Sequence, residues 1–135
     1  MTIQEFFKDD RFAAAAGIEI VEASKGYCRT RLTVTAQHLN AGNRTQGGVL
    51  FTMADLALAV AANSHGQLTF SLNGNITFLR ASGVGDTLYA EARERHLGRS
   101  TGLYQVEITN QDGKLLATFE GSVFRMGQEL PFEQL

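Results

Sequence analysis

A single aspartate interrupts the most apolar segment of the chain. Residues 49–62 are rich in helix formers and apolar on nearly every face, and Asp55 is the only ionisable residue between positions 47 and 62. Burying an unpaired carboxylate costs free energy, so such a residue usually has a reason to be there. Asp55 is therefore a candidate general base or nucleophile. The alternative is a structural aspartate that faces solvent at a gap in the fold or accepts a hydrogen bond from the backbone.

Two adjacent glycines, Gly47 and Gly48, precede this segment. If a helix begins there, its first N–H groups have no intrahelical acceptor and carry the positive end of the helix dipole. Glycine also lets a ligand approach the backbone closely, so these amides could stabilise a developing oxyanion. A tight passage from a loop into a helix would explain the same pair of glycines without any chemistry.

The spacing between the two features limits how they can cooperate. Gly47 and Asp55 are about eight residues apart, which is roughly 12 Å along a helix. An amide in the first turn and a carboxylate two turns later cannot both touch one carbonyl group. If both act, they must come from different copies of the chain. The spacing therefore predicts a site shared across a two-fold dimer interface.

The rest of the chain supplies the elements that would position these groups. Segments with period-two alternation surround the apolar segment, and Asp112-Gly113 is a hairpin signal. We expect one domain in which a single antiparallel sheet folds around one helix. The expected elements are an N-terminal helical segment (1–16), strands at 18–22 and 28–34, a central helix at about 47–64, strands at 68–79, 86–97, 101–109 and 114–124, and a tail (127–135).

Composition narrows the class of protein. The chain has 135 residues, 44% of them hydrophobic, and a net charge of −2, which disfavours nucleic acid as a partner. A lone cysteine, Cys28, excludes an internal disulfide, and the N-terminus has no basic region followed by an apolar run. The apolar run around Asp55 is too short and too charged to span a membrane. We expect a cytoplasmic protein with no membrane partner.

The histidines, the cysteine and Ser71 lack the neighbouring sequence that metal binding or nucleophilic catalysis would need. His38, His65 and His96 show no metal-ligand spacing, so we expect surface or capping roles and no bound metal. Cys28 falls on the inward face of a predicted strand and is interpreted as a core residue. Ser71 lacks the Gly-x-Ser-x-Gly elbow of serine hydrolases.

Residues 38–59 resemble the signature of the hotdog-fold acyl-CoA thioesterases, and in particular the phenylacetic-acid-degradation (PaaI-like) group. Leu39-Asn40, the Gly47-Gly48 pair, Phe51 and Ala54-Asp55 carry the resemblance. It continues through residues 75–80, 85–88 and 98–104, and so covers nearly the whole chain from position 18 to position 126. The loop and helix motif is fairly specific, whereas the strand matches alone would be weak.

The resemblance implies an α+β hotdog fold and hydrolysis of an aryl- or medium-chain acyl-CoA to a carboxylic acid and free coenzyme A. By position, Asp55 matches the catalytic carboxylate, acting as base or nucleophile, and Gly47 matches the amide that polarises the thioester carbonyl. Asn40 matches the side chain that places the attacking water, and Ser71 a serine that supports the carboxylate or the water. The family takes Asp and Ser from one chain and Asn and Gly from its partner. The resemblance implies no cofactor beyond the coenzyme A of the substrate. It also implies that the protein forms a homodimer or a homotetramer.

One departure from the family pattern concerns Gln46, which stands where relatives carry histidine before Gly-Gly. Glutamine forms hydrogen bonds but cannot change charge near neutral pH, so an acid–base role at this position is in doubt. We assign Gln46, Gly48 and Arg80 to substrate binding. A non-catalytic acyl-CoA sensor on the same fold would also explain the missing histidine. A hotdog hydratase would need a histidine near Asp55, and none is present.

Two sets of residues are weaker candidates for contact with the substrate. Guanidinium groups suit coenzyme A phosphates, although for each arginine a solvated surface position is the default interpretation. The arginines considered are Arg80, Arg93, Arg95 and Arg99. The residues considered for the acyl pocket are Phe51, Leu58 and Phe70.

Overall fold

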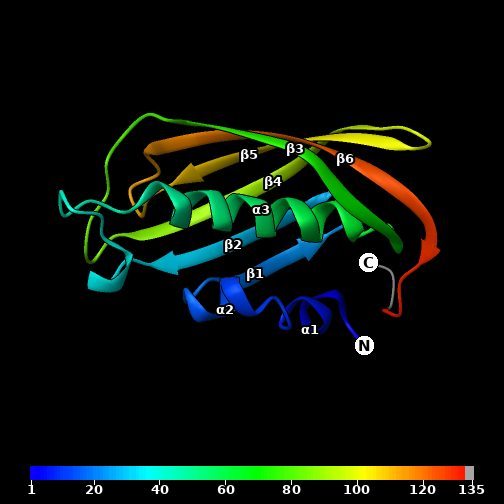
Figure 1. Cartoon of the computed structure of the whole chain (residues 1–135), viewed down its shortest axis with the longest axis horizontal. Helices are drawn as coiled ribbons and strands as arrows, with labels where there is room; N and C mark the ends of the chain where they lie inside the picture. The colour runs from blue at the N-terminus through cyan, green and yellow to red at the C-terminus, as the bar shows by residue number, and fades with distance from the viewer. Residues whose placement is uncertain (133–135) are drawn as a thin grey trace.

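The computed structural model describes residues 1–132, in which six antiparallel strands curve around one long helix (Figure 1). The helix, α3 (Gly47–Asn63), begins at the predicted residue and ends one residue before the predicted end. The strands are β1 (Glu19–Ser24), β2 (Tyr27–Thr33), β3 (Gln67–Phe78), β4 (Thr87–Leu97), β5 (Thr101–Thr109) and β6 (Leu115–Glu129). This confirms the predicted antiparallel sheet wrapped around a central helix.

The sheet order is β1-β2-β4-β5-β6-β3, so β1 and β3 form its two edges. Strand β6 runs to Glu129, beyond the expected end at position 124, because its last residues pair with the start of β3 at Gln67. Residues 127–129 of the expected tail therefore belong to the sheet, and residues 133–135 lie outside the described part of the chain. Strand β3 pairs with β6 on one side only, which leaves its other edge open.

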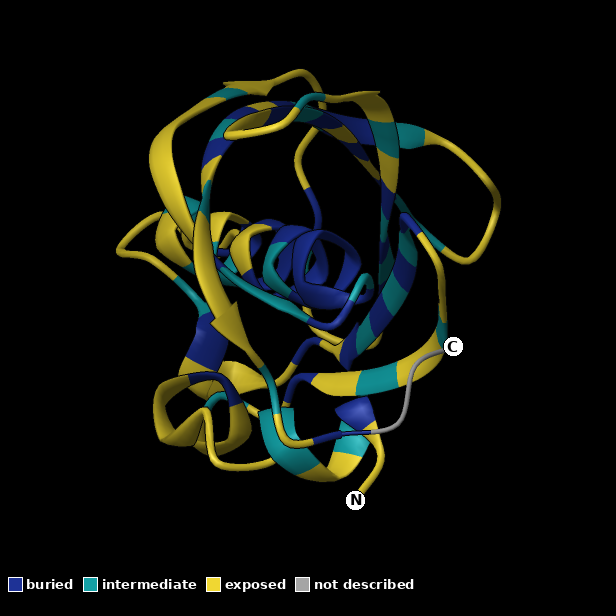
Figure 2. Ribbon diagram, turned by 90° about the vertical axis from the view of Figure 1, so that its right-hand side faces the viewer, coloured by how far each residue is buried: buried dark blue, intermediate teal, exposed yellow. Residues whose placement is uncertain are grey.

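Helix α3 is buried on nearly all sides. Met53, Ala54, Ala57 and Ala61 are fully excluded from solvent. Figure 2 shows α3 in the centre of the fold with the curved sheet around it. A helix that is apolar all round is stable only when other elements cover each of its faces, which is the arrangement found here. No helix within residues 1–132 is long and apolar enough to cross a bilayer.

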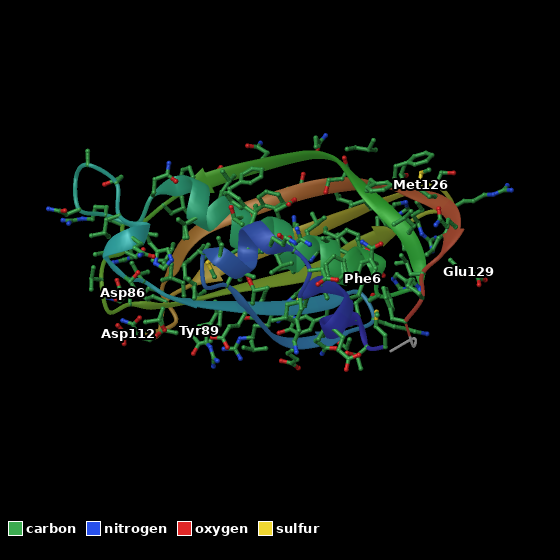
Figure 3. All side chains as sticks on the ribbon, turned by 60° about the horizontal axis from the view of Figure 1, so that its bottom comes forward. Phe6, Asp86, Tyr89, Asp112, Met126 and Glu129 are labelled. Carbon is green, nitrogen blue, oxygen red and sulfur yellow. The ribbon has the colours of Figure 1, made fainter. Side chains whose placement is uncertain are left out.

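Two short helices, α1 (Ile3–Phe7) and α2 (Arg11–Ala15), contact α3 where the sheet does not cover it. In Figure 3, turned so that both come forward, they lie in front of α3. Helices this short need help to form, and a capping box between Thr2 and Glu5 satisfies the first amides of α1. The side chain of Asp10 caps α2 by accepting a hydrogen bond from Ala13 N–H at 3.1 Å.

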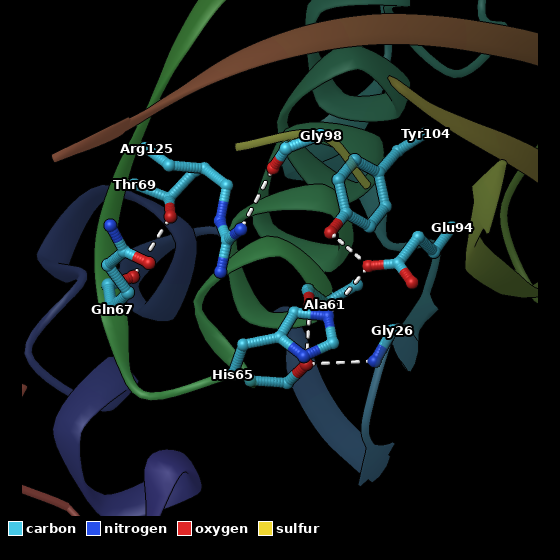
Figure 4. A network of polar contacts seen from close by, with 10 residues as sticks. Gly26, Ala61, His65, Gln67, Thr69, Glu94, Gly98, Tyr104 and Arg125 are labelled. Carbon is cyan, nitrogen blue, oxygen red and sulfur yellow. Dashed lines mark hydrogen bonds and ion pairs between the residues drawn. The ribbon is translucent and has the colours of Figure 1, made fainter. Parts of the chain in front are cut away.

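A polar network fastens the C-terminal end of α3 to the sheet (Figure 4). His65 Nε2 lies 2.7 Å from Glu94 Oε1, and the Tyr104 hydroxyl donates to the same oxygen at 2.7 Å. Burial alone would raise the pKa of Glu94, but the hydrogen bonds from Tyr104 and His65 outweigh it and hold this pKa below its usual value. His65 is thus half-buried and is a partner of Glu94. The surface or capping role expected from the sequence did not include this contact.

Two other residues flagged by the sequence have structural roles. Cys28 is fully buried, as predicted, and burial raises the pKa of its thiol to about 12, which disfavours the reactive thiolate. His38 is buried, with Nδ1 against Thr35 N–H at 2.9 Å and Nε2 against the Ala16 carbonyl at 2.6 Å. His38 therefore ties the loop before α3 to the end of α2.

Candidate active site

The N-terminus of α3 presents one free backbone amide. Gln46 is the N-cap residue, and its Oε1 accepts a hydrogen bond from Gly48 N–H at 2.5 Å. Val49 N–H donates to the Gln46 carbonyl at 3.0 Å. Gly47 N–H makes no hydrogen bond within residues 1–132, so it is available to an oxygen of a ligand. A Cβ at Gly47 would lie 2.8 Å from Cζ of Phe78, so a larger residue would displace that ring.

Asn40 belongs to the loop that leads to this amide. Its Oδ1 accepts hydrogen bonds from Gly42 N–H at 2.9 Å and from Arg44 N–H at 3.1 Å, which fixes the shape of the loop. Its Nδ2 group forms no hydrogen bond within the described residues. Asn40, Gly47 and Arg80 all line one hollow of about 460 Å³, named here the Gly47 hollow.

Asp55 and Ser71 line a different hollow of about 290 Å³, named here the Asp55 hollow. Most of its wall is apolar and comes from α1, α3 and β3, including Phe6, Phe7 and Leu58. Such a mixture, a carboxylate and a hydroxyl in an otherwise apolar hollow, is typical of sites that hold an apolar group beside a reacting bond.

The surroundings of Asp55 favour its neutral form more than water does. The residue reaches solvent at the rim of the hollow, yet the packed atoms around it replace part of its hydration. Burial raises the pKa of Asp55 above its usual 3.8, and the negative charge of Asp10 raises it further. A carboxylate with a raised pKa is a stronger proton acceptor once ionised, which suits a general base.

Within the described part of the chain, the two hollows share no lining residue. Asn40, Gly47 and Arg80 face one of them, whereas Asp55 and Ser71 face the other. Eight residues of helix separate the amide from the carboxylate, roughly 12 Å at the helical rise. One copy of the chain therefore carries two half-sites and does not bring the amide to the carboxylate.

Several residues of these hollows were missed or misplaced by sequence reasoning. Of the residues considered for the acyl pocket, Leu58 and Phe70 line the Asp55 hollow. Phe51 does not line it and packs edge-on against Phe119, with ring centroids 5.1 Å apart. Phe6 and Phe7 were not considered, because a short helix carries no signal for where it docks. The positions of Phe6 and Phe7 in the sequence indicate only that the helix has an apolar side.

Arg93 and Arg95 lie apart from both half-sites. They line a hollow on the outer face of the sheet together with Glu91, Glu107 and Glu120. Arg93 is held by Glu91 at 3.2 Å, so its charge is already balanced. Arg80, in contrast, lines the Gly47 hollow, and so does Arg44. Among residues 1–132, no group of three histidine, cysteine or acidic side chains could hold a metal.

Residues 42–117, more than half of the chain, match the thioesterase superfamily, and the chain belongs to this family. Its six-stranded sheet around a long helix is the hotdog fold that the resemblance predicted. The acyl-coenzyme A thioesterase PaaI of Escherichia coli K12 is 43% identical over 121 residues, which span 90% of this chain and 86% of the relative.

Solved structures agree with this assignment. The Escherichia coli PaaI protein from the phenylacetic acid degradation operon matches with a TM-score of 0.89 and 42% identity, covering 93% of this chain and 91% of that chain. A hypothetical thioesterase of Streptococcus pneumoniae TIGR4, solved with coenzyme A, matches with a TM-score of 0.84 and 29% identity, covering 92% and 99% of the two chains. A hypothetical thioesterase solved with coenzyme A therefore shares this fold.

Proposed function

We propose that this protein hydrolyses an aryl- or medium-chain acyl-CoA to a carboxylic acid and free coenzyme A, at sites shared between two copies of the chain. The observation that carries the proposal is the separation of a free amide at Gly47 from a carboxylate in an apolar hollow at Asp55. The thioesterase relatives, one of them solved with coenzyme A, support the choice of substrate.

In this mechanism, the thioester carbonyl accepts a hydrogen bond from Gly47 N–H of one copy. Asp55 of the other copy takes a proton from water, and the resulting hydroxide attacks the carbonyl carbon. The negative charge on the carbonyl oxygen is stabilised by the amide at the helix N-terminus. The tetrahedral intermediate then collapses and expels the coenzyme A thiolate, which takes the proton from Asp55 and restores its carboxylate. Asn40 and Ser71 would orient the water.

Asp55 could also attack the carbonyl carbon directly. This step would release the thiolate and leave an acyl–aspartyl anhydride, which water then hydrolyses to restore the carboxylate. Both routes need the Gly47 amide and the Asp55 carboxylate at one thioester. Both therefore require the same pairing of half-sites.

We place the second copy against the open edge of β3. This strand carries large apolar side chains that are exposed in one copy, with Phe70 56%, Leu72 59% and Phe78 52% exposed. An open edge with apolar side chains is a surface that natural proteins normally cover. Phe70 lines the Asp55 hollow and Phe78 the Gly47 hollow, so a partner here would reach both half-sites.

The proposal also includes the pairing of dimers into a tetramer and the cellular compartment of the protein. The outer face of the sheet carries Arg95 together with Glu107 and Glu120, charges of both signs that suit pairing of two dimers into a homotetramer. The reduced Cys28 suits the cytoplasm.

A thiol-release assay tests the proposed reaction. We expect the protein to release coenzyme A from at least one member of a panel of phenylacetyl-, benzoyl-, octanoyl- and palmitoyl-CoA. The alternative, a non-catalytic acyl-CoA sensor, is favoured by one observation, since Gln46 only caps Gly48 and cannot titrate. Tight binding of these esters without release of thiol would support the sensor and contradict the proposed reaction.

The pH profile gives an independent check of Asp55. A base must be ionised to act, so kcat/KM should fall as the pH drops through a pKa that lies above the usual 3.8 of aspartate. Removing the negative charge of Asp10 lowers the pKa of Asp55, and Asp10→Asn should therefore shift the acid limb to lower pH. Asparagine keeps the helix cap, and Asp9→Asn on the exposed turn before it is the matched control. An acid limb that Asp10→Asn leaves in place would contradict this electrostatic coupling.

A further inference from the structure

Phe7, the last residue of α1, contributes to the walls of two separate hollows. One is the Asp55 hollow described above. The other, named here the α2 hollow, measures about 240 Å³ and is lined by Phe7 together with Ala13 of α2, Leu56 of α3 and Ile18, which directly precedes β1. Among residues 1–132, Phe7 is the only one that lines both hollows. Phe7 therefore lies where the two hollows approach each other.

The structure holds Phe7 firmly in this position. The capping box at Thr2 fixes the start of α1, and Ile3 is fully buried beneath the helix. The Phe7 ring packs edge-on against Phe6 with ring centroids 5.1 Å apart, and Phe6 packs in turn against Phe132 at 5.5 Å. A ring held by such a chain of packed rings is a wall of fixed position rather than a loose surface side chain.

The size of the Asp55 hollow limits what it can hold. A dry apolar cavity of about 150 Å³ accepts a benzene ring. At about 290 Å³, the Asp55 hollow has room for a ring with a short linker, or for a chain of moderate length. The α2 hollow is lined by the buried apolar residues Ala13, Ile18 and Leu56. Its polar lining residues are Gln4, Lys8, Asp10 and Glu19.

We propose that Phe7 is the specificity-determining residue that limits the length of the acyl group. The group enters the Asp55 hollow and ends against the Phe7 ring, which closes the way into the α2 hollow. Without the ring the two hollows join, and the space open to an acyl chain nearly doubles. This inference rests on the proposed function, because it takes the Asp55 hollow as the acyl side of a thioester site.

Binding of non-hydrolysable S-alkyl-CoA thioethers tests the role of Phe7 separately from catalysis. Isothermal titration of S-octyl-CoA and S-dodecyl-CoA gives the ratio of the two Kd values for the wild type, Phe7→Ala and Phe7→Leu. We expect Phe7→Ala to change this ratio about tenfold or more in favour of the dodecyl compound, since each added methylene in an apolar pocket is worth about tenfold or more in specificity. Phe7→Leu should shift the ratio in the same direction by less.

The matched control is Phe12→Ala, which truncates a phenylalanine that is 75% exposed on α2 and lines neither hollow. It should leave the ratio unchanged. A ratio that also stays unchanged in both Phe7 variants, with thermal unfolding showing at least Phe7→Leu to be folded, would overturn the inference. If the wild type binds the thioethers but releases no thiol from the esters, the proposed reaction is wrong. The Kd ratio then still decides whether Phe7 limits the length of the acyl group.

Discussion

Replacing Asp55 with asparagine is expected to lower kcat for the best acyl-CoA substrate about a thousandfold. Asparagine has nearly the same shape, but its amide can neither accept a proton from water nor attack a carbonyl carbon. Loss of a general base costs about two to four orders of magnitude, and loss of a nucleophile at least as much. Thiol release under saturating substrate measures the effect directly.

Two controls separate lost chemistry from lost structure. Asp55 is a partly desolvated carboxylate without an ion-pair partner among the described residues, so its neutral replacement should not destabilise the fold. We expect thermal unfolding of Asp55→Asn at or above the wild-type temperature and an unchanged Kd for S-octyl-CoA. A kcat within about tenfold of wild type would show that Asp55 is not the base or nucleophile of this reaction.

The fold was largely predictable because its signals are local. The apolar segment after Gly47 indicated a wrapped helix, and the alternation in β5 (Thr101–Thr109) predicted that strand with its observed bounds. The distance between Gly47 and Asp55 depends on helical rise alone, so the separation into half-sites follows from the sequence spacing once the segment is helical.

The features that sequence reasoning missed are contacts between residues far apart in the chain. Phe7 meets the Asp55 hollow only because α1 docks on α3, and nothing in a five-residue helix specifies that docking site. His65 meets Glu94 across 29 positions because α3 ends beside β4, a consequence of the complete sheet order. Gln46 was assigned to substrate binding on family position, and only the geometry shows its oxygen on Gly48 N–H.

The second large effect is a return of activity, which we expect when two inactive variants of the chain are mixed. The first chain is Asp55→Asn, which keeps Asn40 and Gly47. The second carries Asn40→Ala and Gly47→Ala, which remove the loop-bracing oxygen and set a methyl group against Phe78, but keeps Asp55. In a mixed dimer, one site takes Asp55 from the second chain and the free amide from the first, and is intact. The other site combines the Asp55→Asn substitution with the altered loop at Asn40 and the methyl group that displaces Phe78 at Gly47.

The most direct measurement is thiol release by such mixtures after the chains have been unfolded together and refolded, with differently tagged chains to verify the mixed dimers. A one-to-one mixture gives mixed dimers in half of the population, each with one intact site, so roughly a quarter of wild-type activity should return. A mixture of Asp55→Asn with Asp55→Ala is the control and should stay inactive. If verified mixed dimers remain as inactive as either parent chain, the amide and the carboxylate do not come from different copies, and the shared site is wrong.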